Sequence, residues 1–226
     1  MRSWIMAQTW RDLLFAHWPV PAAQLAHAVP PQFELDLWEG QAYIGVIPFR
    51  MDRVHLRALF PLPWLSATPE INVRTYVKCG GRGGVYFLSL HASNFAAVSI
   101  AHRFFHLPYF QAAMKVESNE ETIHYDAQAG DAAFRGCYHP SGEAAFARPG
   151  TLEHWLTERY CFFALDRKGN PIRGEVDHTP WSLQPAEASI EVNTMTAPFG
   201  IRLPDVPPLL LFSHKLDVKM WMPERV

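Results

Sequence analysis

The chain has 226 residues, of which 49% are hydrophobic and 19% are charged, and its formal net charge is −2. This length and composition predict one globular domain over residues 1–226 with a substantial core, and they do not require a second domain. Because the basic residues are dispersed, neither nucleic acid nor an anionic membrane is expected as a partner.

Apolar runs of strand length, many rich in Val, Ile, Tyr and Phe, recur between turn signals along most of the chain. They predict strands at 41–49, 70–78, 84–91, 121–126, 159–165, 173–178, 187–193 and 209–218. Helical spacing is confined to three segments, 21–29, 94–106 and 151–157. The sequence therefore predicts a mainly β protein in which a few helices decorate a sheet.

The cysteines and the N-terminus indicate where the protein resides. Cys79, Cys137 and Cys161 are odd in number and far apart, without a C-x-x-C pair, which is typical of reduced thiols. The first 18 residues contain Arg2, Gln8, Arg11 and Asp12, so they predict neither a signal peptide nor a spanning helix. A cytoplasmic protein is the expectation.

The strand at 70–78 alternates strictly between polar and apolar residues. Glu70, Asn72 and Arg74 fall on one face, and Ile71 and Val73 fall on the other. In a flat sheet the polar face would be solvated, whereas in a closed barrel it can line a cavity. The three polar residues are therefore the first candidates for a ligand-binding site, with an internal network that merely closes the barrel as the alternative.

Glycines at the end of this strand predict a tight hairpin with the strand that follows. A four-residue loop at 80–83 would place Arg74 opposite Ser89 and Asn72 opposite His91, so that all four share one face. A loop longer or shorter by one residue would present neighbouring leucines there instead. The polarity of both strands favours the four-residue loop and adds Ser89 and His91 to the candidate ligand-binding residues.

Several motifs in fixed order resemble a known family. They are Phe15-Ala16-His17-Trp18-Pro19-Val20-Pro21, Ile47-Pro48-Phe49, Glu70-Ile71-Asn72-Val73-Arg74-Thr75-Tyr76-Val77, Gly84-Val85-Tyr86-Phe87-Leu88-Ser89-Leu90, Leu107-Pro108-Tyr109, Glu158-Arg159-Tyr160 and His178-Thr179-Pro180-Trp181. Together they resemble the YqjF-like family of bacterial proteins, a domain of unknown function similar to the acetoacetate decarboxylase superfamily. The resemblance implies an antiparallel β-barrel or cone with peripheral helices around a central cavity.

The resemblance also bears on the chemistry. Acetoacetate decarboxylases form a Schiff base with a lysine that follows a proline, and the similar place here is Pro108-Tyr109-Phe110, which has no amine. Lys115 and Lys78 do not occupy that place, so a Schiff-base decarboxylase is not expected. Glu70 resembles an active-site glutamate of the decarboxylases, and Tyr109 presents a phenol where they place the amine.

These observations predict a small-molecule-binding protein that acts, if it is an enzyme, by acid–base chemistry on a carbonyl or carboxylate compound. Glu70 and Tyr109 are the expected catalytic residues, and Arg159 joins the ligand-binding residues as a second anion-binding group. His102 and His106 have the spacing of a metal pair, but they lie on a polar helix face beside an arginine. No metal and no cofactor are expected.

The alternative function is a non-catalytic structural or interaction barrel whose polar residues form an internal network. A homodimer is a reasonable default for a protein of this kind, although no sequence feature requires it. The identity of the ligand is not readable from the sequence.

Overall fold

A computed structural model describes residues 3–57, 68–94 and 105–226. Its strands are β1 (Met6–Val20), β2 (Glu34–Leu35), β3 (Ala42–Leu56), β4 (Thr68–Cys79), β5 (Arg82–Ala92), β6 (Tyr109–Gln111), β7 (Ala113–Asn119), β8 (Thr122–Ala129), β9 (Ala132–Pro140), β10 (Ala145–Phe146), β11 (Cys161–Leu165), β12 (Pro171–His178), β13 (Ser182–Asn193), β14 (Leu209–Met220) and β15 (Glu224–Arg225). Its helices are α1 (Ala22–Ala26), α3 (Leu152–Thr157) and a 3₁₀ turn at Ala197–Phe199.

Seven of the described strands close into a barrel. They follow the order β12-β11-β5-β4-β3-β1-β14, and an additional pairing between β12 and β14 completes the ring. All neighbours in the ring are antiparallel except β11 and β5. Apolar side chains from the inner faces of these strands form one core cluster, which includes Phe15, Phe49 and Phe162, and Trp181 joins it from the segment between β12 and β13.

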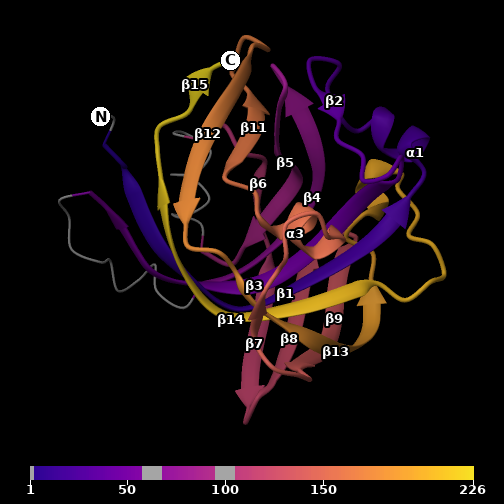
Figure 1. The fold of residues 1–226 in the computed structure, drawn as a ribbon. Helices are drawn as coiled ribbons and strands as arrows, with labels where there is room; N and C mark the ends of the chain where they lie inside the picture. Colours follow the sequence, from indigo (N-terminus) through magenta and orange to yellow (C-terminus); the bar gives the residue numbers. More distant parts are fainter. Residues whose placement is uncertain (1–2, 58–67, 95–104) are drawn as a thin grey trace.

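The remaining long strands form an outer layer, β13-β9-β8-β7, which continues from β14 and lies beside the barrel in Figure 1. It covers the outward faces of β1, β3 and β4. A second core cluster fills this interlayer space, with Ile71 and Val73 from β4 against Tyr125 from β8 and Phe134 from β9. Both faces of β4 are therefore buried, which explains its near-continuous burial pattern.

Helix α3 is attached to the interior of the barrel. Thr151 caps its start, since its Oγ1 accepts a hydrogen bond from the backbone N–H of His154. Leu156 packs into the barrel core, and its carbonyl oxygen accepts a hydrogen bond from the hydroxyl of Tyr76 at 2.9 Å. The last turn of α3 is thus held against β4, where it forms one wall of the interior.

Most predicted elements are confirmed. Each of the eight expected strands overlaps a strand of the structure, and the helix expected at 151–157 is α3. The helix expected at 21–29 is shorter, at Ala22–Ala26. The sequence interpretation missed the longer strands β1, β7 and β9 and the short strands β2, β6, β10 and β15. The helix expected at 94–106, with His102 on it, falls mainly on residues 95–104, outside the described part of the chain. Among the described helices, none has the length and apolar character of a membrane span.

The predicted register of the β4–β5 hairpin is wrong. The turn has two residues, Gly80 and Gly81, both with positive φ, and Cys79 pairs with Arg82. A register shift then occurs in β5 opposite Val73 and Arg74, which adds one residue to β5. Without this bulge, the two-residue turn would leave Ser89 and His91 on the predicted face of the hairpin. The extra residue reverses the side to which each β5 residue beyond it points.

Candidate functional site

The barrel encloses a cavity of about 70 Å³. A single buried water requires roughly 10–15 Å³ of cavity volume, so the space admits a few waters or one small organic molecule. Five of the polar side chains that sequence reasoning selected line it, namely Glu70, Asn72, Arg74, Tyr109 and Arg159. Their roles stay predictions, but their placement in one cavity is a feature of the structure.

The alternation of β4 delivers three of these residues. Glu70, Asn72 and Arg74 point into the barrel because Ile71 and Val73 occupy the interlayer core on the other face. All three polar residues are less than 9% exposed. Buried polar groups ordinarily find hydrogen-bond partners, so their partners decide what the cavity can hold.

Glu70 and Tyr109 form the acidic end of the cavity. The Tyr109 hydroxyl donates a hydrogen bond of 2.8 Å to Glu70 Oε2. Burial raises the pKa of Glu70 to about 8, and the hydrogen bond from Tyr109 offsets part of that rise. Burial and the nearby Glu70 raise the pKa of Tyr109 well above its usual value. At neutral pH both groups therefore carry protons, and Glu70 can donate one to a ligand.

Arg74 forms the cationic end. Its guanidinium lies over the rings of Phe15 and Tyr76, at 5.2 and 5.8 Å from their centroids, and its Nη2 donates a weak bond of 3.4 Å to the Leu156 carbonyl. Within the described ranges no carboxylate pairs with Arg74, and its Nε has no hydrogen-bond partner. A buried cation without a counter-ion carries a large desolvation penalty, which an anion in the cavity would relieve.

Arg159 contacts the same aromatic ring as Arg74, with its guanidinium 4.9 Å from the Tyr76 ring centroid. It follows α3, and its Nε donates a 2.6 Å bond to the carbonyl of Trp155, one of the last carbonyls of that helix. Its Nη1 donates a 2.8 Å bond to Asp36, a salt bridge that neutralises it from outside the cavity. Its Nη2 has no partner among the described residues, so it adds a second open donor to the cationic end.

Two indoles also belong to the polar lining, and sequence reasoning missed both. The Nε1 atoms of Trp10 and Trp181 are buried in the cavity wall without an acceptor in the described ranges, and the rings are stacked at 5.8 Å between centroids. Asn72 Oδ1 also lacks a partner there. Trp181 belongs to the motif His178-Thr179-Pro180-Trp181, so a signal for it was present. Trp10 lies in β1, which the patterns did not predict.

Ser89 and His91 do not line the cavity, and their assignment to this site is corrected. Ser89 pairs with Val73 and His91 pairs with Ile71, so both lie on the face opposite to that of Glu70. The reason is the bulge in β5, which brings Leu90 opposite Asn72 and into the cavity wall. Burial lowers the pKa of His91 to about 4.

The lysines weighed for Schiff-base chemistry lie elsewhere. Lys78 forms a salt bridge of 3.1 Å with Asp36 at the outer surface. Lys115 lies on β7 in the outer layer, 72% exposed and paired with Glu117. Among the described residues that line the cavity, none is a lysine. Tyr109 lines the cavity and bonds to Glu70, and its correspondence to the amine position of the decarboxylases stays a prediction.

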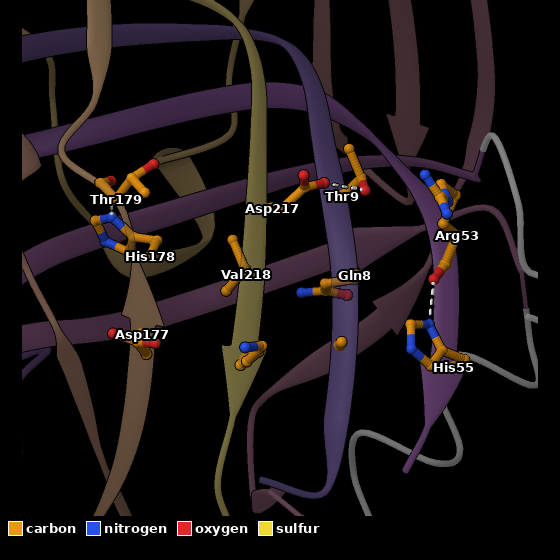
Figure 2. A pocket seen from close by; sticks show the side chains of 11 residues that line it. Gln8, Thr9, Arg53, His55, Asp177, His178, Thr179, Asp217 and Val218 are labelled. Carbon is orange, nitrogen blue, oxygen red and sulfur yellow. Dashed lines mark hydrogen bonds between the residues drawn. The ribbon is translucent and has the colours of Figure 1, made fainter. Parts of the chain in front are cut away.

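A larger groove of about 450 Å³ lies outside the cavity, across β1, β12 and β14 (Figure 2). Figure 2 shows Thr9 and Asp217 facing each other across two strands, where the threonine hydroxyl donates a 2.6 Å bond to the carboxylate. Gln8 and His178 line both this groove and the cavity. These two residues therefore form a wall that the groove and the cavity share.

Comparisons with known proteins identify the family of this chain. A model of the DUF2071 family, described as an uncharacterized conserved protein, matches residues 7–217. The uncharacterized protein YqjF of Bacillus subtilis is 46% identical over 222 residues, which cover 96% of this chain and 91% of that protein. These two matches confirm the predicted resemblance to the YqjF-like family.

Solved structures are similar in fold at low sequence identity. Acetoacetate decarboxylase from Legionella pneumophila has a TM-score of 0.67 and 14% identity, covering 98% of this chain and 87% of that one. The enduracididine biosynthesis enzyme MppR complexed with pyruvate has a TM-score of 0.67 and 8% identity, covering 100% of this chain and 91% of that one. The mainly β, acetoacetate decarboxylase-like fold predicted from the sequence is confirmed.

Proposed function

This chain belongs to the DUF2071 family of uncharacterized conserved proteins, and we propose that it binds a small carboxylate that also carries a carbonyl group, inside the barrel. In this proposal Arg74 and Arg159 hold the carboxylate, and Glu70 with Tyr109 acts on the carbonyl by acid–base chemistry. Neither Lys78 nor Lys115 takes part, so no Schiff base forms.

The observation that carries the proposal is the unpaired state of Arg74. Its side chain is buried, it lines the cavity, and in the described part of the chain it has neither a carboxylate partner nor an acceptor for Nε. A carboxylate accepts charge-assisted hydrogen bonds from guanidinium groups, and Arg159 Nη2 offers a second open donor beside the first. A bound carboxylate would satisfy both groups at once.

The acidic end supports the second half of the proposal. A protonated Glu70 donates a hydrogen bond to a carbonyl oxygen, draws electron density from the carbonyl carbon and makes the adjacent C–H more acidic. Tyr109, bonded to the other oxygen of the carboxyl group, fixes its orientation. Exclusion of water by Phe49, Leu90 and Trp181 in the cavity wall strengthens such a bond.

A structural neighbour gives independent support of a limited kind. MppR, which has a similar fold, is known in complex with pyruvate, a small compound with both a carboxylate and a carbonyl. At 8% identity this likeness concerns the fold alone. It indicates that a barrel of this architecture accommodates a molecule of the proposed class.

The test is ligand binding by the native protein and by Arg74→Gln, measured by isothermal titration and by thermal shift with a panel of oxo acids. A ligand at one hundred times its dissociation constant stabilises the native protein by about 2.7 kcal/mol, and the shift is expected to vanish in Arg74→Gln. Arg82→Gln is the matched control, because Arg82 pairs with Glu175 at the surface and is 43% exposed. It should bind like the native protein.

One outcome would favour a structural barrel instead. Arg74 and Tyr76 both bond to the Leu156 carbonyl, so Arg74 contributes to holding α3. If no oxo acid binds the native protein while Arg74→Gln unfolds far more easily than Arg82→Gln, Arg74 holds the helix in place and the proposal fails.

A further inference from the structure

The cavity has two polar ends that do not meet. Glu70 and Arg74 lie four residues apart on the same face of β4, so their Cα atoms are about 13 Å apart along the strand. Glu70 is bonded to Tyr109, whereas Arg74 contacts Phe15, Tyr76 and Leu156. In the described ranges these contacts share no residue, and Asn72 lies between the two ends.

We infer that the ligand is an oxo monocarboxylate in which at least two carbon atoms separate the carbonyl from the carboxylate. This inference rests on the proposed function, whose ligand class it narrows. In a 2-oxo acid the two functional groups occupy adjacent carbons. Such a molecule reaches the cationic end or the acidic end, and it leaves the other end without a partner.

The charges of the lining residues indicate that the ligand carries one carboxylate. Arg159 is already paired with Asp36 at 2.8 Å, a carboxylate that Lys78 also contacts, and Arg74 is the cation that lacks a carboxylate in the described part of the chain. The other end presents Glu70 and Tyr109, which both favour the protonated state in this buried setting. A second carboxylate placed there would meet the Glu70 carboxyl group instead of a cation, and it would be desolvated without compensation.

The size of the cavity sets an upper limit on the size of the ligand. About 70 Å³ holds roughly five to seven water-sized groups. A short oxo acid of about five carbons fits this space, whereas a sugar phosphate or a nucleotide exceeds it. Ile47 and Leu90, which pair with Asn72 between the two ends, also line the cavity, and their apolar side chains suit a short methylene spacer.

The experiment is an isothermal titration series with carboxylates that each differ from 4-oxopentanoate in one feature. The probes are pyruvate, 4-oxopentanoate, pentanoate and 2-oxoglutarate. We expect 4-oxopentanoate to bind at least tenfold more tightly than pyruvate, because it reaches both ends. We also expect 4-oxopentanoate to bind more tightly than pentanoate, which lacks the carbonyl, and than 2-oxoglutarate, which carries a second carboxylate.

Two variants test how each end of the cavity contributes to the binding of 4-oxopentanoate. Glu70→Met should reduce the affinity for 4-oxopentanoate to that for pentanoate and leave pentanoate binding unchanged, whereas Arg74→Gln should weaken both ligands alike. Glu117→Met on the exposed strand β7 is the matched control and should change neither affinity. Urea denaturation of each variant verifies that it is folded.

The outcomes separate this inference from the proposed function. If pyruvate binds as tightly as 4-oxopentanoate and its binding needs Arg74, the length requirement is overturned and the proposed function stands. If 2-oxoglutarate binds most tightly, the charge count is overturned in the same way. If no member of the series binds the native protein, the proposed function and the inference both fall.

Discussion

The two faces of β4 are buried to the same extent and yet differ in kind. On one face Ile71 and Val73 are fully buried and pack against β8 and β9. On the other face Glu70 and Asn72 are only 2% and 5% exposed, but they border a cavity, and Asn72 Oδ1 lacks a partner in the described residues. Burial therefore does not distinguish the core from the site, whereas the partners of the polar atoms do.

The largest expected effect comes from the packed face. Ile71→Ala removes a fully buried side chain from the interlayer core and should lower the free energy of unfolding by about 2–5 kcal/mol. Asn72→Ala, the neighbouring truncation on the cavity face, should lower it by less than about 1 kcal/mol, because it removes an atom that already lacks a partner. Urea denaturation of both variants measures the difference. Equal losses would show that the cavity face is also structural.

The next effect is a pH dependence of the protein's stability, which arises from Glu70 on the cavity face of β4. The pKa of Glu70 is about 8 in the folded protein and lies near 4.3 in an unfolded chain. Between these values the folded state binds the proton and the unfolded state does not, so stability falls by about 1.4 kcal/mol per pH unit as pH rises. The contribution is complete below pH 4 and is lost above pH 8.

Glu70→Gln removes this titration. Relative to the native protein, the variant should gain stability on the order of 4 kcal/mol between pH 5 and pH 8. Urea denaturation at several pH values measures the gain, and Glu187→Gln at an exposed position of β13 is the control. Native and Glu70→Gln curves that stay parallel across this range would contradict the raised pKa.

Two tyrosines bond to Glu70, one from each side of β4, so their substitutions compare the two faces of this strand. Tyr125 donates a 2.7 Å bond to the backbone carbonyl of Glu70 from the interlayer side, and Tyr109 donates a 2.8 Å bond to its carboxyl group from the cavity. Tyr125→Phe leaves a buried carbonyl without this donor and should destabilise the protein by about 1–3 kcal/mol.

Tyr109→Phe should destabilise the protein by less than about 1 kcal/mol at neutral pH, since the Glu70 carboxyl group is then mostly protonated and borders open space. It should also raise the pKa of Glu70 further, because the hydrogen bond that lowers this pKa is lost. Stability would then continue to fall with pH beyond pH 8, which the same denaturation series detects. If Tyr109→Phe is as damaging as Tyr125→Phe, the acidic end is part of the scaffold.

The sequence was sufficient for the cavity face of β4. A period of two, unbroken from Glu70 to Arg74, assigns faces without knowledge of any other strand, and the structure keeps that alternation. Tyr109 was identified through the family resemblance, which aligns it with a reactive position. The structure places its hydroxyl on Glu70.

The residues that sequence reasoning missed depend on long-range pairing. Trp10 enters the cavity because β1 pairs with β3 and β14, contacts that no local pattern encodes, and Asp12 adopts a positive φ near a register shift in β1. Arg159 was selected from its motif, but its neutralisation by Asp36 joins residues 123 positions apart. Such contacts follow from the closure of the barrel and not from local spacing.

The smallest effect concerns Ser89, which the bulge in β5 moved from the predicted site to the packed face. Its side chain is 1% exposed, lies opposite Val73, and has an Oγ atom without a partner in the described ranges. Removal of an unsatisfied buried hydroxyl relieves its desolvation penalty, so Ser89→Ala should change the free energy of unfolding by no more than about 1 kcal/mol, in the stabilising direction. Urea denaturation measures this change, and ligand binding should stay at the native level. Loss of oxo acid binding in Ser89→Ala would return Ser89 to the cavity and contradict the observed register, because a residue on the interlayer face cannot touch a ligand inside the barrel.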